Sequence, residues 1–238
     1  MCESCGCGDS EMVPIEVQAR ILSSNERMAA HNRHHFEAAD VFAVNLMGSP
    51  GSGKTAVLEA TARARKGLRI GAMSGDLATD RDAERLRAVG IPAVTVTTGS
   101  ACHLDAELVH KALHELDWKG FDLLFIENVG NLVCPAVYDL GQADNVVVLS
   151  VTEGEDKPLK YPVMFRKADL VLITKTDLLP YLPFNMDVLL ENLAKVMPDP
   201  RAIRLSAVTG EGMAEWMDWL ACRCEARALA TAVGERVC

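Results

Sequence analysis

The stretch GSPGSGKT, residues 48–55, decides the fold of this chain. It matches G-x-x-x-x-G-K-[ST], follows the apolar run VFAVNLM (41–47) and opens the helix-type segment KTAVLEATARARK (54–66). A glycine-rich turn between a strand and a helix cradles phosphate with backbone N–H groups and the positive end of the helix. Lys54 is expected to neutralise the β- and γ-phosphates, and Thr55 to place its hydroxyl on Mg²⁺. The predicted phosphate contacts are Gly48, Ser49, Pro50, Gly51, Ser52, Gly53, Lys54 and Thr55.

Outward from this loop, strand-type runs alternate with helix-type segments. The alternation predicts an α/β fold with a mostly parallel, doubly wound sheet, and the near-continuous apolar strands predict helices on both faces. The further strand-type runs are RIGAM (69–73), AVTVT (93–97), DLLFIEN (122–128), NVVVLSV (145–151), ADLVLITK (168–175) and the short AIRLS (202–206). The helix-type segments cover residues 79–90, 104–116, 186–196 and 211–229.

The chain divides into three parts. Residues 1–13 are polar and rich in Cys and Gly, which predicts a flexible metal-binding tail. Apolar residues recur at helical spacing over residues 14–40, which predicts one or two helices leading into the domain. Residues 41–238 show no further boundary and form the nucleotide-binding domain.

Composition restricts the partners and the compartment. The formal net charge of −9 argues against non-specific binding to nucleic acid or to an anionic membrane. The beginning of the chain has no signal-peptide pattern, and the apolar runs are too short to span a bilayer. We expect a cytoplasmic protein, in which the 8 cysteines stay reduced and clustered thiols serve as metal ligands or redox groups.

The segment ITKTD (173–177) selects the nucleotide. It is similar to the guanine-recognition motif Asn-Lys-x-Asp of phosphate-loop GTPases, with Thr174 at the Asn position. A carboxylate at Asp177 can accept hydrogen bonds from guanine N1–H and N2–H₂, and the stem of Lys175 would cover the base. SAVTG (206–210) resembles the second base-contacting loop, through Ser206 and Ala207. We therefore predict GTP rather than ATP.

Three further residues are predicted around the γ-phosphate. Glu127 ends an apolar strand, where an acid binds Mg²⁺ directly or through water. Gly130 would let a backbone N–H approach the γ-phosphate. Asp76 is the candidate for the first switch, whereas Asp80 and Asp82 are interpreted as acids at a helix N-terminus. The predicted catalytic residues are Lys54, Asp76 and Glu127, and the predicted Mg²⁺ ligands are Thr55, Asp76 and Glu127.

Two sets of cysteine and histidine are candidates for transition metals. Cys102, His103 and Cys134 follow strands on the nucleotide side of the sheet, and two thiolates with an imidazole suit Zn²⁺ or Ni²⁺. Cys2, Cys5 and Cys7 lie together in the tail. Their residue types allow a redox role, and as ligands they do not choose between Ni²⁺ and Zn²⁺.

The stretches MCESCGCG, GSPGSGKT, SGD, ACHL, ENVGNLVCP and ITKTDLL together resemble the HypB family, hydrogenase nickel-incorporation GTPases related to the urease accessory GTPase. The resemblance implies a slow GTPase that uses GTP and Mg²⁺ and helps to insert Ni²⁺ into the large subunit of [NiFe]-hydrogenase, together with a zinc-binding accessory maturation protein. It implies a GTP-dependent homodimer. It also implies a tight nickel site at Cys2, Cys5 and Cys7, and a second site for Ni²⁺ or Zn²⁺ at Cys102, His103 and Cys134.

The chain departs from the family pattern in its histidines. Many members carry a long His-rich stretch, and here only HNRHH (31–35) remains, which we interpret as a solvated helix face. His110 and His114 are interpreted as surface residues. We treat Cys222, Cys224 and Cys238 as bystanders.

Other functions stay open at this point. They are a nickel buffer with nucleotide-gated binding, an accessory GTPase for another metalloenzyme, and a small-molecule kinase.

Overall fold

The sheet has seven strands that all run parallel, in the order β3-β2-β4-β1-β5-β6-β7. The computed structural model describes residues 15–65, 67–99 and 101–234. Cys2, Cys5, Cys7, Cys238 and the predicted flexible tail 1–13 lie outside these residues. The predicted doubly wound α/β architecture is confirmed. The strands are β1 (Phe42–Met47), β2 (Ile70–Asp76), β3 (Ala93–Thr97), β4 (Leu123–Glu127), β5 (Asp144–Ser150), β6 (Leu170–Thr174) and β7 (Ala202–Leu205).

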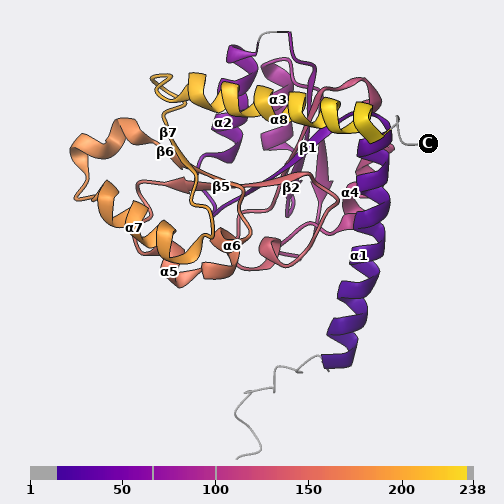
Figure 1. The fold of residues 1–238 in the computed structure, drawn as a ribbon, viewed down its shortest axis with the longest axis horizontal. Coiled ribbons are helices and arrows are strands. Elements are labelled where there is room, and N and C mark those ends of the chain that lie inside the picture. The colour runs from indigo at the N-terminus through magenta and orange to yellow at the C-terminus, as the bar shows by residue number, and fades with distance from the viewer. Residues whose placement is uncertain (1–14, 66, 100, 235–238) are drawn as a thin grey trace, which may run out of the picture.

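Helices cover both faces of the sheet (Figure 1). Alternate residues of a strand point to opposite faces, so Val44 joins the core under α2, α3 and α8, while the neighbouring Ala43 joins the core under α1 and α4. A third core cluster lies between the β5–β6 half of the sheet and α6 and α7. The helices are α1 (Ile15–Ala38), α2 (Lys54–Ala64), α3 (Arg81–Ala88), α4 (Ala106–Leu113), α5 (Lys157–Lys160), α6 (Pro162–Arg166), α7 (Met186–Val196) and α8 (Met213–Gly234).

Several boundaries differ from the sequence prediction for local reasons. Segment 14–40 contains one helix, α1, and its N-terminal part extends beyond the body of the domain (Figure 1). Helix α4 begins two residues later than predicted because Asp105 is its N-cap, with Oδ1 accepting from the Leu108 N–H at 2.8 Å. Strand β2 continues past residue 73, since Asp76 still pairs with Thr97 of β3. Asp76 therefore ends the strand and does not follow it.

The sequence pattern did not assign helices between β5 and β6, and the structure has two short ones there. Helices α5 and α6 each carry a proline in the first turn, Pro158 and Pro162. Proline suits the first turn of a helix but cannot continue a preceding one. The segment is therefore split into pieces too short to show helical periodicity.

Helix α1 is fixed to the domain by two buried asparagines. The Asn32 Nδ2 donates to the carbonyls of Ala106 at 2.8 Å and Leu140 at 3.1 Å. The Asn25 side chain accepts from the Ala106 N–H and donates to the Asp139 carbonyl, both at 2.8 Å. Gly141 allows the loop before β5 to approach α1 closely, because a Cβ at this position would lie 2.6 Å from the Ala29 carbonyl oxygen. These contacts set α1 against the start of α4.

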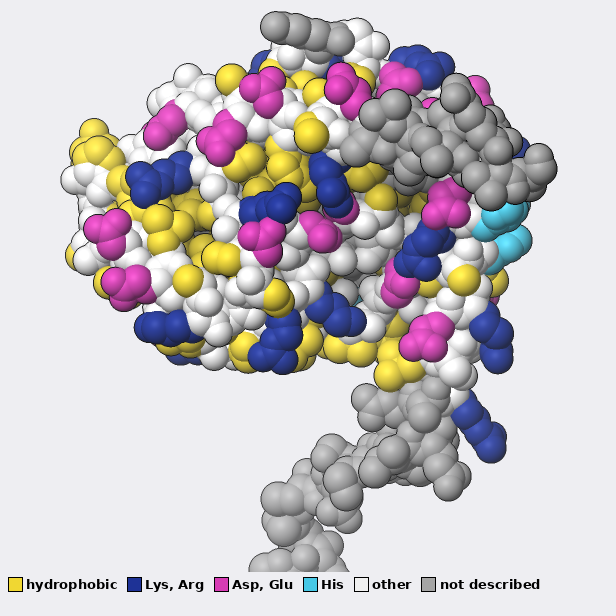
Figure 2. All heavy atoms as spheres, in the orientation of Figure 1, with side chains coloured by type: hydrophobic (Ala, Val, Ile, Leu, Met, Phe, Trp, Pro, Cys, Tyr) yellow, Lys and Arg dark blue, Asp and Glu magenta, His cyan; other side chains and the backbone are white. Residues whose placement is uncertain are grey.

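The surface carries both signs of charge, and basic and acidic side chains alternate over the face seen in Figure 2. Within the part of the chain that the structure describes, no helix combines the length and apolar character needed to cross a membrane. Cys222 and Cys224 lie on α8, and Cys224 packs against the core under α2 and α8.

Replacing Trp216 by Ala tests how α8 is docked on the sheet. The Trp216 side chain is fully buried, and its Nε1–H donates to the Thr61 hydroxyl of α2 at 2.8 Å. We expect Trp216→Ala to lower the free energy of unfolding by about 3–5 kcal/mol, since a large cavity remains. Val208→Ala, at an 85% exposed side chain, is the control and should change it by less than about 0.5 kcal/mol. Urea unfolding followed by circular dichroism measures both, and a loss below about 1 kcal/mol for Trp216→Ala would contradict this docking.

Candidate nucleotide and metal site

The phosphate-binding loop joins β1 to α2 and is shaped by glycines. Gly48 has φ +153°, and a Cβ there would lie 2.3 Å from the Val148 carbonyl oxygen of β5. Gly53 has φ +101° and turns the chain into α2. Because neither position accepts a side chain at low cost, the loop is fixed over the carboxyl ends of the central strands, which is where parallel sheets bind ligands.

Lys54 and Thr55 lie at the start of α2 and are almost completely buried. The Lys54 Nζ donates to the carbonyls of Ser49 at 3.1 Å and Gly48 at 3.3 Å. Desolvation lowers the pKa of Lys54, and the neighbouring Glu127 acts in the opposite direction. The ammonium group therefore lies inside the loop, where it can meet a phosphate oxygen.

Glu127 lies beside Thr55, another of the three predicted Mg²⁺ ligands. The Thr55 hydroxyl donates to Glu127 Oε1 at 2.8 Å, and Ser74 donates to Oε2 at 3.4 Å. Burial raises the pKa of Glu127 to about 7, against the Thr55 hydrogen bond and the charge of Lys54. A buried hydroxyl and carboxylate are hard oxygen donors, so this donor set fits Mg²⁺.

A cavity of ≈ 390 Å³ opens beside this loop. Asp76 lines it and accepts the N–H groups of Ala78 at 2.8 Å and Thr79 at 2.9 Å. Partial burial of Asp76 opposes its ionisation, but these backbone donors prevail and hold its pKa below the ordinary value. The predicted Gly130 also lines the cavity, and a Cβ there would come within 2.9 Å of Pro50.

Helix α3 supplies two lining residues that the sequence did not assign to the site, Asp82 and Arg85. Asp82 lies in the first turn of α3, as predicted, and Asp80 is the N-cap residue. The guanidinium of Arg85 is held by Glu59 at 3.0 Å and by Asp82 at 3.1 Å.

The two predicted base-contacting loops lie together. The Thr174 hydroxyl donates to the Ser52 carbonyl at 2.6 Å, and the Lys175 Nζ donates to the Gly51 carbonyl at 2.7 Å. Ser206 donates to Asp177 Oδ1 at 2.6 Å and thereby orients the carboxylate. Ala207 follows in the same loop. Thr174 thus ties this motif to the phosphate-binding loop, in place of an asparagine.

Cys102, His103 and Cys134 converge, although 32 residues separate the cysteines. The two Sγ atoms lie 2.9 Å apart, and one ligand atom from each residue lies within 4.8 Å of the others. Desolvation lowers the pKa of His103, which favours the neutral ring that binds metal. The ring stacks on Tyr138 with centroids 3.9 Å apart. Two thiols and an imidazole fit Zn²⁺ or Ni²⁺.

The segment that follows β4 contacts both sites. Asn128 Oδ1 accepts from the Leu104 N–H at 3.1 Å, next to His103. Asn131 Oδ1 accepts from the N–H groups of Val133 at 2.7 Å and Cys134 at 3.3 Å. The Asn131 N–H donates to the Gly48 carbonyl at 3.0 Å. The segment 127–131 therefore links a Mg²⁺ candidate, the phosphate-binding loop and both halves of the Cys/His group.

Sequence reasoning missed several of these residues. Asn128 and Asn131 could have been noticed in the sequence, because polar side chains that follow a buried strand usually make hydrogen bonds. Nothing in the sequence indicated Tyr138, because its stacking on His103 depends on the fold. Glu153 accepts hydrogen bonds from the Ser49 hydroxyl and from the Ser150 N–H, and it was not assigned either.

The comparisons with known proteins agree with this geometry. A family model described as "CobW/HypB/UreG, nucleotide-binding domain" matches residues 42–204. Hydrogenase maturation factor HypB of Azotobacter chroococcum mcd 1 is 53% identical over 216 residues, which are 90% of this chain and 70% of that protein. The crystal structure of HypB from Helicobacter pylori in complex with nickel has a TM-score of 0.82 at 39% identity, over 85% of this chain and 95% of that one. HypB from Archaeoglobus fulgidus gives 0.79 at 40% identity, over 85% and 100%.

Two alanine substitutions in one loop test the packing at Gly48. Gly48→Ala should lower the free energy of unfolding by about 2–5 kcal/mol, from its backbone conformation and from overpacking against Val148. Gly51→Ala is the matched control, because it has φ +74° but no atom within 4 Å of the added Cβ. It should lower the value by only about 1–2 kcal/mol. Equal losses in urea unfolding would show that the contact with Val148 does not matter.

Proposed function

Because the chain belongs to the HypB family of hydrogenase maturation factors and carries its nucleotide-binding GTPase domain, we propose that it is a GTP-hydrolysing nickel metallochaperone. It would help to insert nickel into the large subunit of a [NiFe]-hydrogenase. One observation carries the proposal. The segment 127–131 is hydrogen-bonded to Gly48 of the phosphate-binding loop, to Cys134 of the Cys/His group, and to Leu104, which follows His103 in the chain.

Guanine selection rests on Asp177. Its carboxylate accepts from the Ser206 hydroxyl through Oδ1, and it retains capacity to accept guanine N1–H and N2–H₂. Adenine offers no such donor pair on that edge. Lys175 crosses to the Gly51 carbonyl, so its stem would lie over the base.

Hydrolysis is proposed to be slow. Lys54 would bind the β- and γ-phosphates, and Thr55, Glu127 and Asp76 would hold Mg²⁺, which neutralises charge on the phosphates when bound. Arg85 is occupied by Glu59 and Asp82, and none of the described residues lining the cavity is a glutamine. With neither a water-orienting glutamine nor a free arginine among the described residues that line the cavity, turnover should be low, and intrinsic rates of order 10⁻⁴ s⁻¹ set the scale.

The nucleotide is proposed to control the metal through Asn131. A γ-phosphate that draws Gly130 toward the loop would move Asn131, and Asn131 holds the backbone of Cys134. The spacing of Cys134 from Cys102 and His103 would then differ between the GTP and GDP states. By linkage, if a nucleotide changes the affinity for the metal by some factor, the metal changes the affinity for that nucleotide by the same factor.

The remaining parts of the proposal concern partners. Homodimerisation with GTP, a zinc-binding accessory protein and a tight nickel site at Cys2, Cys5 and Cys7 are proposed from family membership. Two relatives support a metal role by name, since HypB from Helicobacter pylori was crystallised with nickel, and that of Helicobacter hepaticus is a hydrogenase/urease maturation factor. A nickel buffer whose nucleotide only gates binding is the alternative, and it would release no phosphate from excess GTP.

Asp177→Asn tests the choice of base. An amide N–H₂ at this position would donate to the C2 carbonyl of xanthine and would no longer accept both guanine donors. We expect GTP affinity to fall by about 10–150-fold, the equivalent of about 1.5–3 kcal/mol for a hydrogen bond to a charged group, and XTP affinity to rise. Titration with fluorescent nucleotides measures both. Asp187→Asn, in the first turn of α7, is the control. Unchanged GTP affinity in Asp177→Asn would exclude this carboxylate as the base contact.

Nickel stoichiometry under reducing conditions tests the metal assignments. We expect Cys2/Cys5/Cys7→Ala to lose one nickel and to keep an ion whose affinity differs with GDP and with a non-hydrolysable GTP analogue. Further replacement of Cys134 by Ala should remove that nucleotide-responsive ion, whereas Cys222→Ala, at an exposed thiol, should not. The measurement is equilibrium dialysis with each nucleotide.

Asn131→Ala tests the coupling itself, because it leaves all three ligands in place. The ion should still bind, but the nucleotide response, about 5–150-fold in typical coupled sites, should fall toward onefold. If the response persists undiminished, the coupling does not pass through Asn131. If the affinity for the ion is the same with every nucleotide even in the parent chain, the protein is a GTPase whose metal site is independent of the nucleotide.

A further inference from the structure

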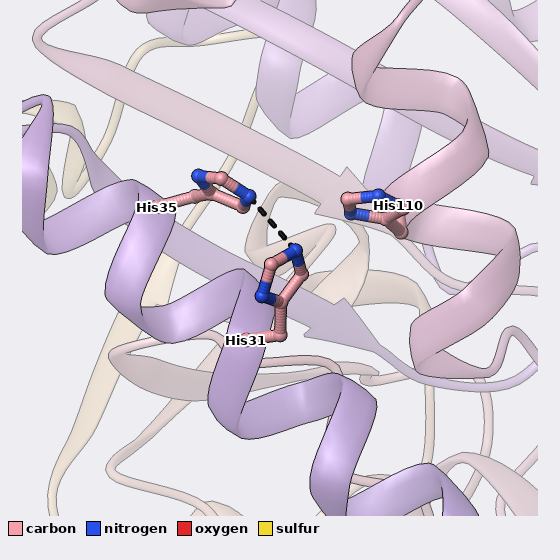
Figure 3. A group of neighbouring side chains, drawn as sticks. All are labelled: His31, His35 and His110. Carbon is pink, nitrogen blue, oxygen red and sulfur yellow. Dashed lines mark hydrogen bonds between the residues drawn. The ribbon is translucent and has the colours of Figure 1, made fainter.

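Three histidines from two helices lie close together (Figure 3), and none of them lines the cavity beside the phosphate-binding loop. His31 and His35 lie one turn apart on α1, with their Nε2 atoms 3.0 Å apart. His110 of α4 faces them, with ring centroids 5.0 Å from His31 and 5.8 Å from His35. The sequence placed these residues on separate solvated faces. Their meeting depends on the docking of α1 on α4, which the sequence does not display.

We propose that His31, His35 and His110 bind one divalent transition-metal ion of the Ni²⁺ or Zn²⁺ type, as a site separate from Cys102, His103 and Cys134. Imidazole is a preferred ligand of both ions. With metal–nitrogen distances of about 2.0–2.1 Å, two ligand nitrogens lie about 3 Å apart in octahedral or tetrahedral coordination. The two Nε2 atoms of α1 already have this spacing. One ligand atom from each of the three residues lies within 4.8 Å of the others, so a modest ring rotation completes the set.

Asn32 holds His110 in a form suited to bind metal. The Asn32 side chain is buried, and its Nδ2 is used by two backbone carbonyls. Its Oδ1 therefore faces His110 Nδ1 at 3.1 Å and acts as the acceptor. His110 must then donate from Nδ1, which leaves the lone pair on Nε2. A metal-bound histidine commonly donates its other N–H to a carbonyl in this way, which fixes ring orientation and raises ligand basicity.

Partial burial and the neighbouring charges favour the neutral form of two of the three rings, His35 and His110. Desolvation lowers the pKa of His35, followed by the charges of His31, His110, His34 and Lys119, and desolvation with His31 and His114 lowers the pKa of His110. Neutral imidazoles are the form that binds metal. His31 is exposed and His35 and His110 are half-buried, so an ion can reach them.

An adjoining cavity of ≈ 390 Å³ is lined by His31 and by the carboxylates of Asp105 and Glu107. Arg27 lines it too, and Glu107 is ion-paired with Lys111 at 2.8 Å, so its wall carries charges of both signs. Tyr138 lines the same cavity and stacks on His103. His31 of the proposed site and Tyr138, which stacks on His103, therefore line the same cavity.

The test uses the tag-free chain with Cys2, Cys5, Cys7, Cys102 and Cys134 replaced by Ala, so that the thiolates of the two other proposed metal sites do not mask a histidine site. Cys222, Cys224 and Cys238 remain in every variant that is compared. We expect this protein to bind one Ni²⁺ in equilibrium dialysis, and Zn²⁺ to compete for the same position. His31→Ala, His35→Ala and His110→Ala should each weaken binding by at least about tenfold, the loss that even outer-shell changes cause at metal sites. Thermal unfolding should shift upward with Ni²⁺ in the five-alanine chain but not in these variants.

His34→Ala is the matched control, because it is an exposed histidine of the same helix outside the group of three. It should bind Ni²⁺ as the parent does. His31 is itself exposed and has no partner among the described hydrogen bonds other than His35, so His31→Ala tests the site without endangering the fold. The proposal is overturned if the five-alanine chain binds no Ni²⁺, or if His34→Ala weakens binding as much as His31→Ala.

Discussion

The close passage of Gly48 beneath the end of β5 is the constraint on which the site depends. A side chain there would collide with the Val148 carbonyl oxygen, so only glycine lets the chain leave β1 and turn over the carboxyl ends of the sheet. The Gly48 carbonyl then accepts from both Lys54 and Asn131. Lys54, the proposed phosphate ligand, and Asn131, in the segment between β4 and Cys134, are therefore hydrogen-bonded to the same carbonyl oxygen.

These shared contacts connect the phosphate-binding loop with the Cys/His group. Segment 127–131 leaves β4 with Glu127 buried against Thr55, passes Pro50 at Gly130, and reaches Cys134 through Asn131. Packed segments of this kind have discrete arrangements and do not deform smoothly. On the proposed function, a change at the phosphate end would therefore reach Cys134 as a change of position.

The sequence alone could predict the candidate residues that belong to local motifs. It could not predict the contacts that depend on how the helices dock on one another. The phosphate-binding loop, Glu127 and Asp177 follow from residue type and from the preceding strand. In the structure Glu127 lies beside Thr55 of that loop, and Asp177 lies beside Ser206. The contact of Cys102 with Cys134 was predicted from their place after strands of one sheet and from the resemblance to the HypB family. His31 and His110 are brought together by Asn32, whose partner Ala106 lies 74 residues away. No periodicity records such a contact. Helices α5 and α6 were missed because prolines cut them below the length at which a pattern can be recognised.

The asparagine contacts of α1 also govern how that helix can move. Asn25 and Asn32 are seven residues apart, two turns of one face, and both bind the backbone of Ala106. If α1 slid by a single turn, both amides would lose these partners, each at a cost of about 1–3 kcal/mol. The helix is therefore fixed in one axial register, and a shift along its axis breaks both contacts with Ala106 at once.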